Sequence, residues 1–176
     1  MKWLKWLLIG VAALLLLFAV VGLALPSQFH VERSVAIAAP AEKVYPLIAS
    51  PTEWKRWTVW NRRDPKMRME YAGPAAGIGA RWSWRSETEG NGNMEFTEAV
   101  PGRSLAYRLS FPELDMESTG MLLITPNGDG VRLSWSNEGS LGANPVNRWF
   151  GLFMDRLVGP DFEAGLENLK RLAEAS

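Results

Sequence analysis

Period-two alternation of apolar and polar side chains recurs in seven stretches of this chain, and it predicts seven half-buried β-strands. The stretches are residues 31–38, 67–71, 80–85, 94–97, 104–111, 121–125 and 131–136, of which 121–125 is apolar on both faces. Turn sequences join the last six, among them Gly90-Asn91-Gly92, Pro101-Gly102 and Asn127-Gly128-Asp129-Gly130. Because short connections make neighbouring strands antiparallel, we expect residues 67–136 to form a six-stranded meander.

Helical spacing replaces this alternation in two regions. Apolar residues at 44, 47 and 48 predict a short helix, which Pro46 should shorten or kink, and Ser50-Pro51-Thr52-Glu53 indicates a capping box that opens a second one. After the meander, Asn144 and Pro145 suit the cap and first turn of a long helix that Gly159-Pro160 should interrupt or kink. One apolar stripe follows this helix, formed by Phe150, Phe153, Met154, Leu157, Val158, Phe162, Leu166, Leu169 and Leu172.

Twenty residues without a charge run from Trp6 to Leu25. As a helix they measure about 30 Å, which is the thickness of the hydrocarbon core of a bilayer. Trp3 and Trp6 fit an aromatic belt, and Pro26 ends the helix. The alternative is a cleaved signal peptide, although its apolar region would be only about 7–15 residues long. The run therefore predicts a transmembrane anchor.

The anchor divides the chain and suggests its orientation. The predicted segments are an anchor at 1–25, a linker at 26–30 and a folded domain at 31–176. Lys2 and Lys5 precede the span, whereas Arg33 is the sole cation in the first ten residues beyond it. The positive-inside rule then predicts a single-pass membrane protein with a cytoplasmic N-terminus and an extracytoplasmic domain.

The composition excludes several kinds of site. The chain has no cysteine and one histidine, His30, which excludes disulfides, thiolate nucleophiles and Cys-bound metals, and we expect no metal and no cofactor. Nineteen basic residues balance nineteen acidic ones, so we expect no nucleic acid partner. His30 should be a solvated linker residue. Gly77-Ile78-Gly79 precedes a strand and lacks a third glycine, so it indicates a turn and not a dinucleotide site.

Alternation also assigns an inward face to each predicted strand, opposite the stripe of the terminal helix. Aromatic and methionine side chains dominate these inward positions, and they would suit an apolar ligand with few fixed polar contacts. The alternative is that they fill a solid core. The candidate lining residues are Met67, Met69, Tyr71, Trp82, Trp84, Met94, Phe96, Tyr107, Phe111, Trp135, Phe150, Phe153, Met154 and Leu157.

Residues 53–68 combine tryptophans with the densest basic charge of the domain. Trp and cations together suit the headgroup region of a bilayer, so we expect this segment to rim the cavity and face the membrane. The alternative is a solvated loop with one or two tryptophans packed in the core. The rim candidates are Trp54, Trp57, Trp60, Arg62 and Arg63, together with Arg33 of the first strand.

Few residues suit acid–base chemistry. Arg33 takes a predicted inward position, where the cost of an unpaired buried guanidinium favours an ion pair at the rim. Glu95 or Glu98 with Tyr107 has suitable groups, but alternation places Glu95 outward and Glu98 near a strand end. We therefore assign no catalytic residue.

Short motifs in a fixed order resemble the polyketide cyclase/dehydrase and lipid-transport family of the START-like (SRPBCC) superfamily, over roughly residues 30–173. The resemblance implies an α+β helix-grip (START-like) fold, in which a seven-stranded antiparallel sheet wraps a long C-terminal helix; here a transmembrane helix precedes it. It also implies a cavity between sheet and helix, without a shared catalytic residue. The motifs are Val31-Glu32-Arg33-Ser34, Pro40-Ala41-Glu42-Lys43-Val44, Gly77-Ile78-Gly79-Ala80, Pro101-Gly102-Arg103, Gly130-Val131-Arg132-Leu133-Ser134-Trp135, Gly159-Pro160-Asp161-Phe162-Glu163 and Gly165-Leu166-Glu167-Asn168-Leu169-Lys170.

These features together predict a membrane-anchored binding protein for a hydrophobic small molecule or lipid, which it would carry, sequester or sense. A first alternative is a cyclase- or dehydratase-type enzyme in which Arg33, Tyr71 or Tyr107 polarises a carbonyl in the same cavity. A second is a non-enzymatic module, filled by its own side chains, that holds a protein partner at the membrane.

Overall fold

All seven predicted strands join one antiparallel sheet in the order β1-β7-β6-β5-β4-β3-β2, so the meander is present and β1 closes onto β7. The computed structural model describes residues 2–114 and 116–175; Met1, Asp115 and Ser176, which fall within the predicted segments 1–25 and 31–176, lie outside the described residues. The strands are β1 Gln28–Ile37, β2 Arg68–Ala72, β3 Arg81–Arg85, β4 Gly92–Val100, β5 Ser104–Phe111, β6 Met116–Asn127 and β7 Gly130–Ser140.

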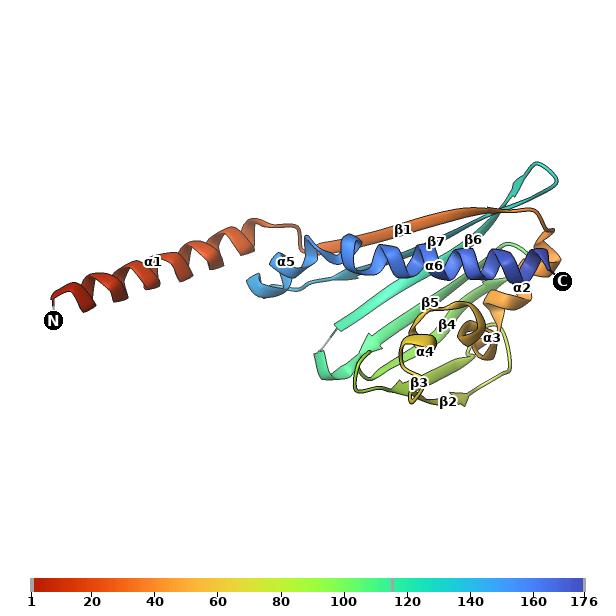
Figure 1. The fold of residues 1–176 in the computed structure, drawn as a ribbon, viewed down its shortest axis with the longest axis horizontal. Helices are drawn as coiled ribbons and strands as arrows, with labels where there is room; N and C mark the ends of the chain where they lie inside the picture. Colours follow the sequence, from red (N-terminus) through yellow and green to blue (C-terminus); the bar gives the residue numbers. More distant parts are fainter. Residues whose placement is uncertain (1, 115, 176) are drawn as a thin grey trace.

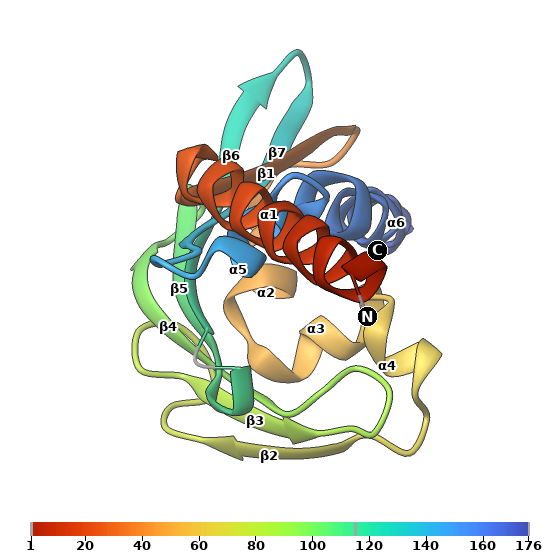
Figure 2. The same ribbon diagram turned by 90° about the vertical axis from the view of Figure 1, so that its left-hand side faces the viewer.

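The sheet curves around the helices that cover its concave face (Figures 1 and 2). The long α6 lies along β1, and α2 and α3 pack beside it. This is the helix-grip arrangement of an α+β domain. The helices are α1 Lys2–Ala24, α2 Ala41–Ala49, α3 Pro51–Trp57, α4 Trp60–Arg63, α5 Pro145–Gly151 and α6 Met154–Glu174, with the 3₁₀ turn η1 at Pro112–Leu114.

Most strands differ in extent from their sequence patterns: β1, β4, β6 and β7 are longer than predicted, and β2 and β3 each begin one residue later. β1 begins at Gln28, because the alternation already starts with the buried Phe29 and continues at Val31. In β6 the burial pattern resolves the stretch that is apolar on both faces: Leu122 and Ile124 are buried, whereas Met121 is exposed. Packing against the core, and not hydrophobicity alone, therefore decides which set points inward.

The prolines do not interrupt their helices where the sequence suggested. Pro46 lies inside α2, which continues to Ala49, and Pro160 lies inside α6, which runs unbroken through Gly159-Pro160. The predicted long helix is instead divided at residues 152 and 153, between α5 and α6. Both proline-containing helices bury one apolar face, and that packing offsets the ~3 kcal/mol cost of an interior proline.

The caps follow the sequence in one of two cases. Asn144 caps α5 as predicted, since its side chain accepts a hydrogen bond from the Val146 N–H at 2.9 Å. The predicted capping box at Ser50 is wrong: Ser50 makes no side-chain cap, and its hydroxyl instead donates to the Ala75 carbonyl at 3.0 Å. Pro51 does occupy the first turn of α3.

Helix α1 projects from the end of the domain opposite the C-terminus (Figure 1). Its segment Trp3–Ala24 has a mean hydropathy of 2.9 and is only 6% buried, so it is long and apolar enough to cross a membrane. Its contacts with the domain are concentrated on α5, where the Phe18 and Trp149 rings stack with centroids 5.2 Å apart.

Candidate functional site

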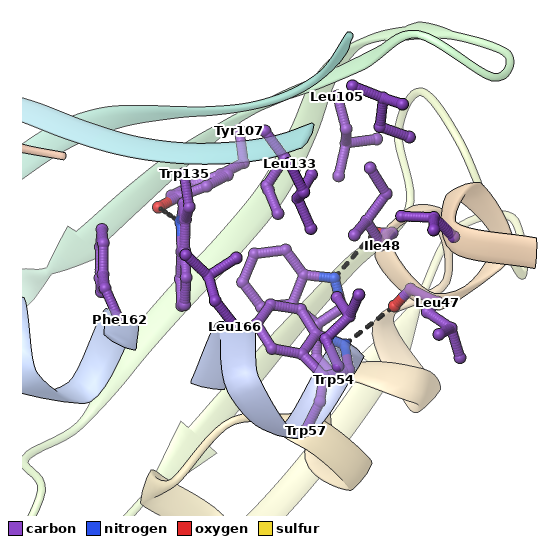
Figure 3. Packing of buried hydrophobic residues seen from close by; sticks show 14 of the residues in the cluster. Leu47, Ile48, Trp54, Trp57, Leu105, Tyr107, Leu133, Trp135, Phe162 and Leu166 are labelled. Carbon is purple, nitrogen blue, oxygen red and sulfur yellow. Dashed lines mark hydrogen bonds between the residues drawn. The ribbon is translucent and has the colours of Figure 1, made fainter. Parts of the chain in front are cut away.

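The concave side of the sheet is filled at one end by packed aromatic rings. Trp54 and Trp57 of α3 contact the ring of Trp135 from β7, and Trp135 stacks face to face on Phe162 of α6 at a centroid distance of 3.8 Å (Figure 3). Phe96 and Trp82 extend the cluster along β4 and β3. These five elements are thereby joined through a dry aromatic core, which we call the filled half of the grip.

Every indole in the centre of this half has a hydrogen-bond acceptor. Trp54 Nε1 donates to the Ile48 carbonyl at 2.8 Å and Trp57 Nε1 donates to the Leu47 carbonyl at 2.9 Å (Figure 3). Both rings are at most 2% exposed. The prediction that Trp54 and Trp57 face a membrane is therefore wrong, because both rings are buried and donate to carbonyls at the end of α2, as in the alternative of tryptophans packed in the core. Trp54 also lines the smaller of the two cavities described next.

The other end of the grip is hollow. A cavity of about 160 Å³ lies between the sheet and the first part of α6, and a second of about 110 Å³ lies between α4 and strands β2 to β5. Trp60, Met94, Leu109 and Phe111 line both, so the two cavities are neighbours across a shared wall. We call them together the hollow half; each is smaller than the ~300–1,000 Å³ usual for a drug-sized ligand.

Most predicted lining residues surround the hollow half. Those on the walls of one or both cavities are Met67, Met69, Trp82, Trp84, Met94, Tyr107, Phe111 and Met154. Phe96 and Trp135 are instead sealed in the filled half, and Tyr71 lies on the edge strand β2, 40% exposed. Phe150, Phe153 and Leu157 are each more than half exposed, and the structure does not bring them into either cavity.

Asn137 is a wall residue that the sequence analysis missed. It occupies an inward position of β7, is 7% exposed and lines the larger cavity, yet its Oδ1 has no hydrogen-bond partner among the described residues. A buried acceptor without a partner costs about 1–3 kcal/mol, so such groups are rare in folded proteins. The signal was available: the inward alternation Val131, Leu133, Trp135 continues to 137.

Tyr107 lines the same cavity, and its hydroxyl lies beside Trp135. Tyr107, Gly120 and Asn137 are consecutive register partners across β5, β6 and β7. A Cβ at Gly120 would overlap the Tyr107 ring, so glycine lets the tyrosine lie across β6 and accept a hydrogen bond from Trp135 Nε1 at 2.9 Å. Burial raises the pKa of Tyr107, which therefore keeps its proton and can donate it to a hydrogen bond.

Helix α4 closes the hollow half through one carboxylate. Asp161 of α6 accepts from Trp60 Nε1 at 2.9 Å and pairs with Arg63, whose guanidinium also lies 3.3 Å from Glu89. Burial raises the pKa of Glu89 above its usual value, although Arg63 opposes that shift. Of the basic rim candidates, Arg63 is thus engaged within the domain, whereas Arg62 is exposed. Asp161 fixes α4 over both cavities.

Arg33 forms the ion pairs predicted for it. From β1 it reaches Asp155 at 2.7 Å and Glu163 at 2.6 Å, two turns apart on α6. A Cβ at Gly159, midway between them, would overlap the guanidinium, so glycine lets Arg33 cross the helix. Arg33 holds the pKa of Asp155 below its usual range. Arg33 lines neither cavity, and its role is to hold α6 on the sheet.

An open groove of about 590 Å³ adjoins the hollow half at the α5 end of the domain. It lies between the β5–β6 turn, the end of β7 and α5, and it includes Leu114, Asn147 and Phe150. Met116, Glu117 and Met154 line both this groove and the larger cavity. The larger cavity of the hollow half therefore adjoins an open surface beside α5.

The two cavities are lined mainly by apolar and aromatic side chains, with a few polar ones such as Asn137, Glu89 and Asp161. His30 is exposed and lies near Glu32 and Glu138, outside the cavities. Among residues 2–114 and 116–175 no group of three His, Asp or Glu side chains is arranged to hold a metal. The arrangement can enclose an apolar group and hydrogen-bond one polar group through Asn137 and Tyr107.

Comparisons with known proteins agree with this architecture. The family described as polyketide cyclase / dehydrase and lipid transport matches residues 28–174, so the chain belongs to that family. Protein MLL2253 from Mesorhizobium loti is similar in structure, with a TM-score of 0.60 at 18% identity over 84% of this chain and 98% of that one. No curated protein matches the chain.

Two further structures share the fold at low identity. The di-domain ARO/CYC protein StfQ from the steffimycin biosynthetic pathway gives a TM-score of 0.63 at 16% identity, over 84% of this chain and 51% of that one. Truncated norcoclaurine synthase from Thalictrum flavum gives 0.61 at 13% identity, over 82% and 92%.

Proposed function

We propose that this member of the polyketide cyclase / dehydrase and lipid transport family binds a hydrophobic small molecule in the hollow half of its grip, with one polar group of the ligand on the wall formed by Tyr107 and Asn137. The observation that carries the proposal is the buried Oδ1 of Asn137, which has no hydrogen-bond partner among the described residues and lies on a cavity lined mainly by apolar and aromatic side chains. A ligand group that donates to Oδ1 removes the cost of that buried acceptor.

The chemistry of the wall narrows the ligand class. Asn137 Oδ1 requires a donor, whereas the protonated hydroxyl of Tyr107 supplies one. A hydroxyl, a primary amide or a protonated carboxylic acid both donates and accepts, and so suits the two together. The surrounding methionines and aromatic rings adapt to an irregular apolar body. We therefore propose a mainly hydrocarbon ligand with one such group.

Paired probes test this proposal. The full chain in detergent should bind 1-naphthol about tenfold more tightly than 1-methoxynaphthalene, because only the alcohol can donate to Asn137. Isothermal titration calorimetry measures both constants. In Asn137→Leu the preference should disappear while the ether still binds. Asn93→Leu, a substitution at an exposed position of β4, is the matched control and should keep the preference.

Two outcomes would contradict the proposal. Equal affinity for the two probes in the unchanged protein would show that Asn137 and Tyr107 do not hydrogen-bond the ligand. Absence of binding to either probe, with the fold intact by circular dichroism, would favour a domain whose remaining space is not used for a ligand, as in the interaction module considered above.

We further propose that α1 is an uncleaved anchor, with the N-terminus cytoplasmic and the domain on the outer side, where the protein carries, sequesters or senses its ligand. The length and hydropathy of Trp3–Ala24 support the anchor, and Lys2 and Lys5 support the orientation. In intact cells, an impermeant maleimide should label Asp129→Cys, since the chain has no other cysteine. Labelling only after permeabilisation would reverse the orientation, and release by alkaline carbonate would argue against an anchor.

A cyclase- or dehydratase-type reaction in the same cavity is the second candidate. The protonated hydroxyl of Tyr107 on the cavity wall favours it, because such a donor can polarise a ligand carbonyl. Of the other two residues considered, Arg33 is engaged by carboxylates and Tyr71 lies outside both cavities. Cyclisation of a short aryl poly-β-ketone, monitored by mass spectrometry, should be lost in Tyr107→Phe and kept in Tyr71→Phe. If the unchanged protein shows no turnover, the enzyme hypothesis is contradicted and ligand binding is the remaining function.

A further inference from the structure

Helix α5 is fastened to the carboxyl end of α1 by three kinds of contact. Trp149 Nε1 donates to the Phe18 carbonyl at 3.0 Å, and the two rings stack. Arg148 donates to the carbonyls of Leu23 and Leu25, which the helix itself leaves without partners. α5 therefore lies beside the last turns of α1 and does not merely follow the domain surface.

A glycine in α1 makes this close approach possible. A Cβ at Gly22 would come within 2.7 Å of Pro145 Cβ and 2.9 Å of Trp149 Nε1. Gly10, on the same helix but away from α5, has no atom within 4 Å of the corresponding position. The packing of α5 against α1 thus depends on residue 22 in a way that the rest of α1 does not share.

The surface that α5 and the following turn present away from the domain is strongly apolar. Val146, Phe150, Leu152 and Phe153 are each more than half exposed. Arg148 is the one charged residue between positions 145 and 153, and its guanidinium is engaged with the carboxyl end of α1 and with the Gly142 carbonyl. Exposed apolar side chains in such a cluster mark a surface that is covered in the working protein.

The position of α5 along α1 says what covers it. Phe18 lies six residues before the end of α1, about 9 Å along the helix axis. If Trp3–Ala24 crosses a bilayer, the ring stacked on Phe18 is within that bilayer and not above it. Phe18 and Trp149 join the two helices through an apolar ring contact, and Val146, Phe150, Leu152 and Phe153 extend the exposed apolar surface beyond the end of α1. A lipid bilayer, and not a soluble partner, matches this placement.

We infer that residues 145–153 are a second membrane element, which lies in the interface of the outer leaflet and is held there by α1. This inference rests on the proposed anchor. The groove lined by Asn147 and Phe150 then opens at the lipid surface, beside the larger cavity with which it shares Met116 and Met154. The hydrophobic ligand therefore passes between the bilayer and the hollow half without crossing water. The filled half lies at the far end.

Single cysteines test the depth of this element, because the chain has none of its own. The full-length protein is labelled with an environment-sensitive fluorophore and reconstituted in phosphatidylcholine vesicles containing brominated lipid. Probes at Phe150→Cys and Leu152→Cys should be quenched at least about half as strongly as a probe at Leu16→Cys within the span. Ile78→Cys is the matched control and should not be quenched, since Ile78 is 63% exposed and belongs to the connection between β2 and β3, two strands that lie far from α1 in Figure 1.

The outcomes separate this inference from the anchor itself. Quenching at residue 16 alone would leave the anchor in place and overturn the embedded α5. Quenching at none of the four positions would contradict both the anchor and the embedded α5. Equal quenching at Ile78 would indicate nonspecific adsorption of the domain and would overturn the inference. As a second test, Gly22→Leu should lower quenching at Phe150→Cys more than twofold by displacing α5, whereas Gly10→Leu should not; no effect of Gly22→Leu would show that α1 does not hold the element.

Discussion

The two halves of the grip contain the same residue types, but in one the side chains fill the space and in the other they surround a cavity. In the filled half, Trp54, Trp57 and Trp135 are packed ring against ring, and each indole N–H has an acceptor. In the hollow half, Trp60, Trp84 and further methionine and aromatic side chains surround empty space. The difference is where helices meet the sheet: α3 brings two rings onto β7, whereas the short α4 only covers the opening. Aromatic content therefore does not by itself distinguish a core from a binding wall.

The largest test of this contrast is truncation of a ring in the filled half. Trp57→Ala should lower the free energy of unfolding by about 3–5 kcal/mol, because it leaves a large buried void and removes the indole N–H that donates to the Leu47 carbonyl. Phe111→Ala, beside existing space, should cost only about 1–2 kcal/mol. Urea denaturation monitored by circular dichroism measures both. Equal losses would mean that the hollow half is packed as tightly as the filled one.

The border between the halves is the next position to disturb. Gly120→Ala should lower the free energy of unfolding by about 1–3 kcal/mol, since the new Cβ overlaps the Tyr107 ring. Combining it with Tyr107→Leu should recover part of that loss, because the shorter side chain does not reach across β6. A double-mutant cycle without coupling between the two positions would contradict this account of Gly120.

Two buried asparagines provide a matched pair across the halves. Asn168, 8% exposed in the filled half, donates to the Trp57 carbonyl at 2.9 Å, whereas the Oδ1 of Asn137 has no partner within residues 2–114 and 116–175. Asn168→Leu should therefore destabilise the protein by about 1–3 kcal/mol, and Asn137→Leu should stabilise it by about 1 kcal/mol. Thermal unfolding in the absence of added ligand measures the signs. A loss of stability in Asn137→Leu would indicate that its side chain is already satisfied.

The smallest expected effect is on the stability of the domain at acidic pH. Arg33 lowers the pKa of Asp155, so the stabilisation from this pair is complete above the ordinary aspartate pKa and is lost as pH falls through the lowered value. Between pH 5 and pH 3 the free energy of unfolding should fall, and Asp155→Asn should make that fall shallower. Denaturant titrations across this range measure the slope. Glu167→Gln, at an exposed position of α6, is the control and should leave the slope nearly unchanged.

The strand order was accessible from sequence because alternation and turn residues are local signals that the sheet preserves. The order of the motifs along the chain predicts the helix-grip fold. The alternation of β1 extends back to Phe29, so the start of this strand is also encoded locally. Membership in the family is likewise consistent with motifs such as Gly130-Val131-Arg132, which begin strands or turns.

The division into filled and hollow halves was not accessible in the same way. Alternation assigns Trp84 and Trp135 equally inward, and only the position of α3 and α6 decides which is sealed. Trp54 and Trp57 were misassigned because a basic, tryptophan-rich segment has the same composition at a membrane and on a core helix. Asn137 was accessible, since it continues an inward alternation with a polar residue. The break before α6 depends on how α5 packs on α1, which no local pattern encodes.

Asp161 of α6 connects α4 to the rest of the domain. One carboxylate holds both Trp60 and Arg63, and through them the whole of α4, over the two small cavities. A ligand larger than those cavities can enter only when these contacts of Asp161 break, and it is enclosed again when they re-form. Under the proposed function, the rate at which a large ligand exchanges then depends on how often the contacts of Asp161 with Trp60 and Arg63 break.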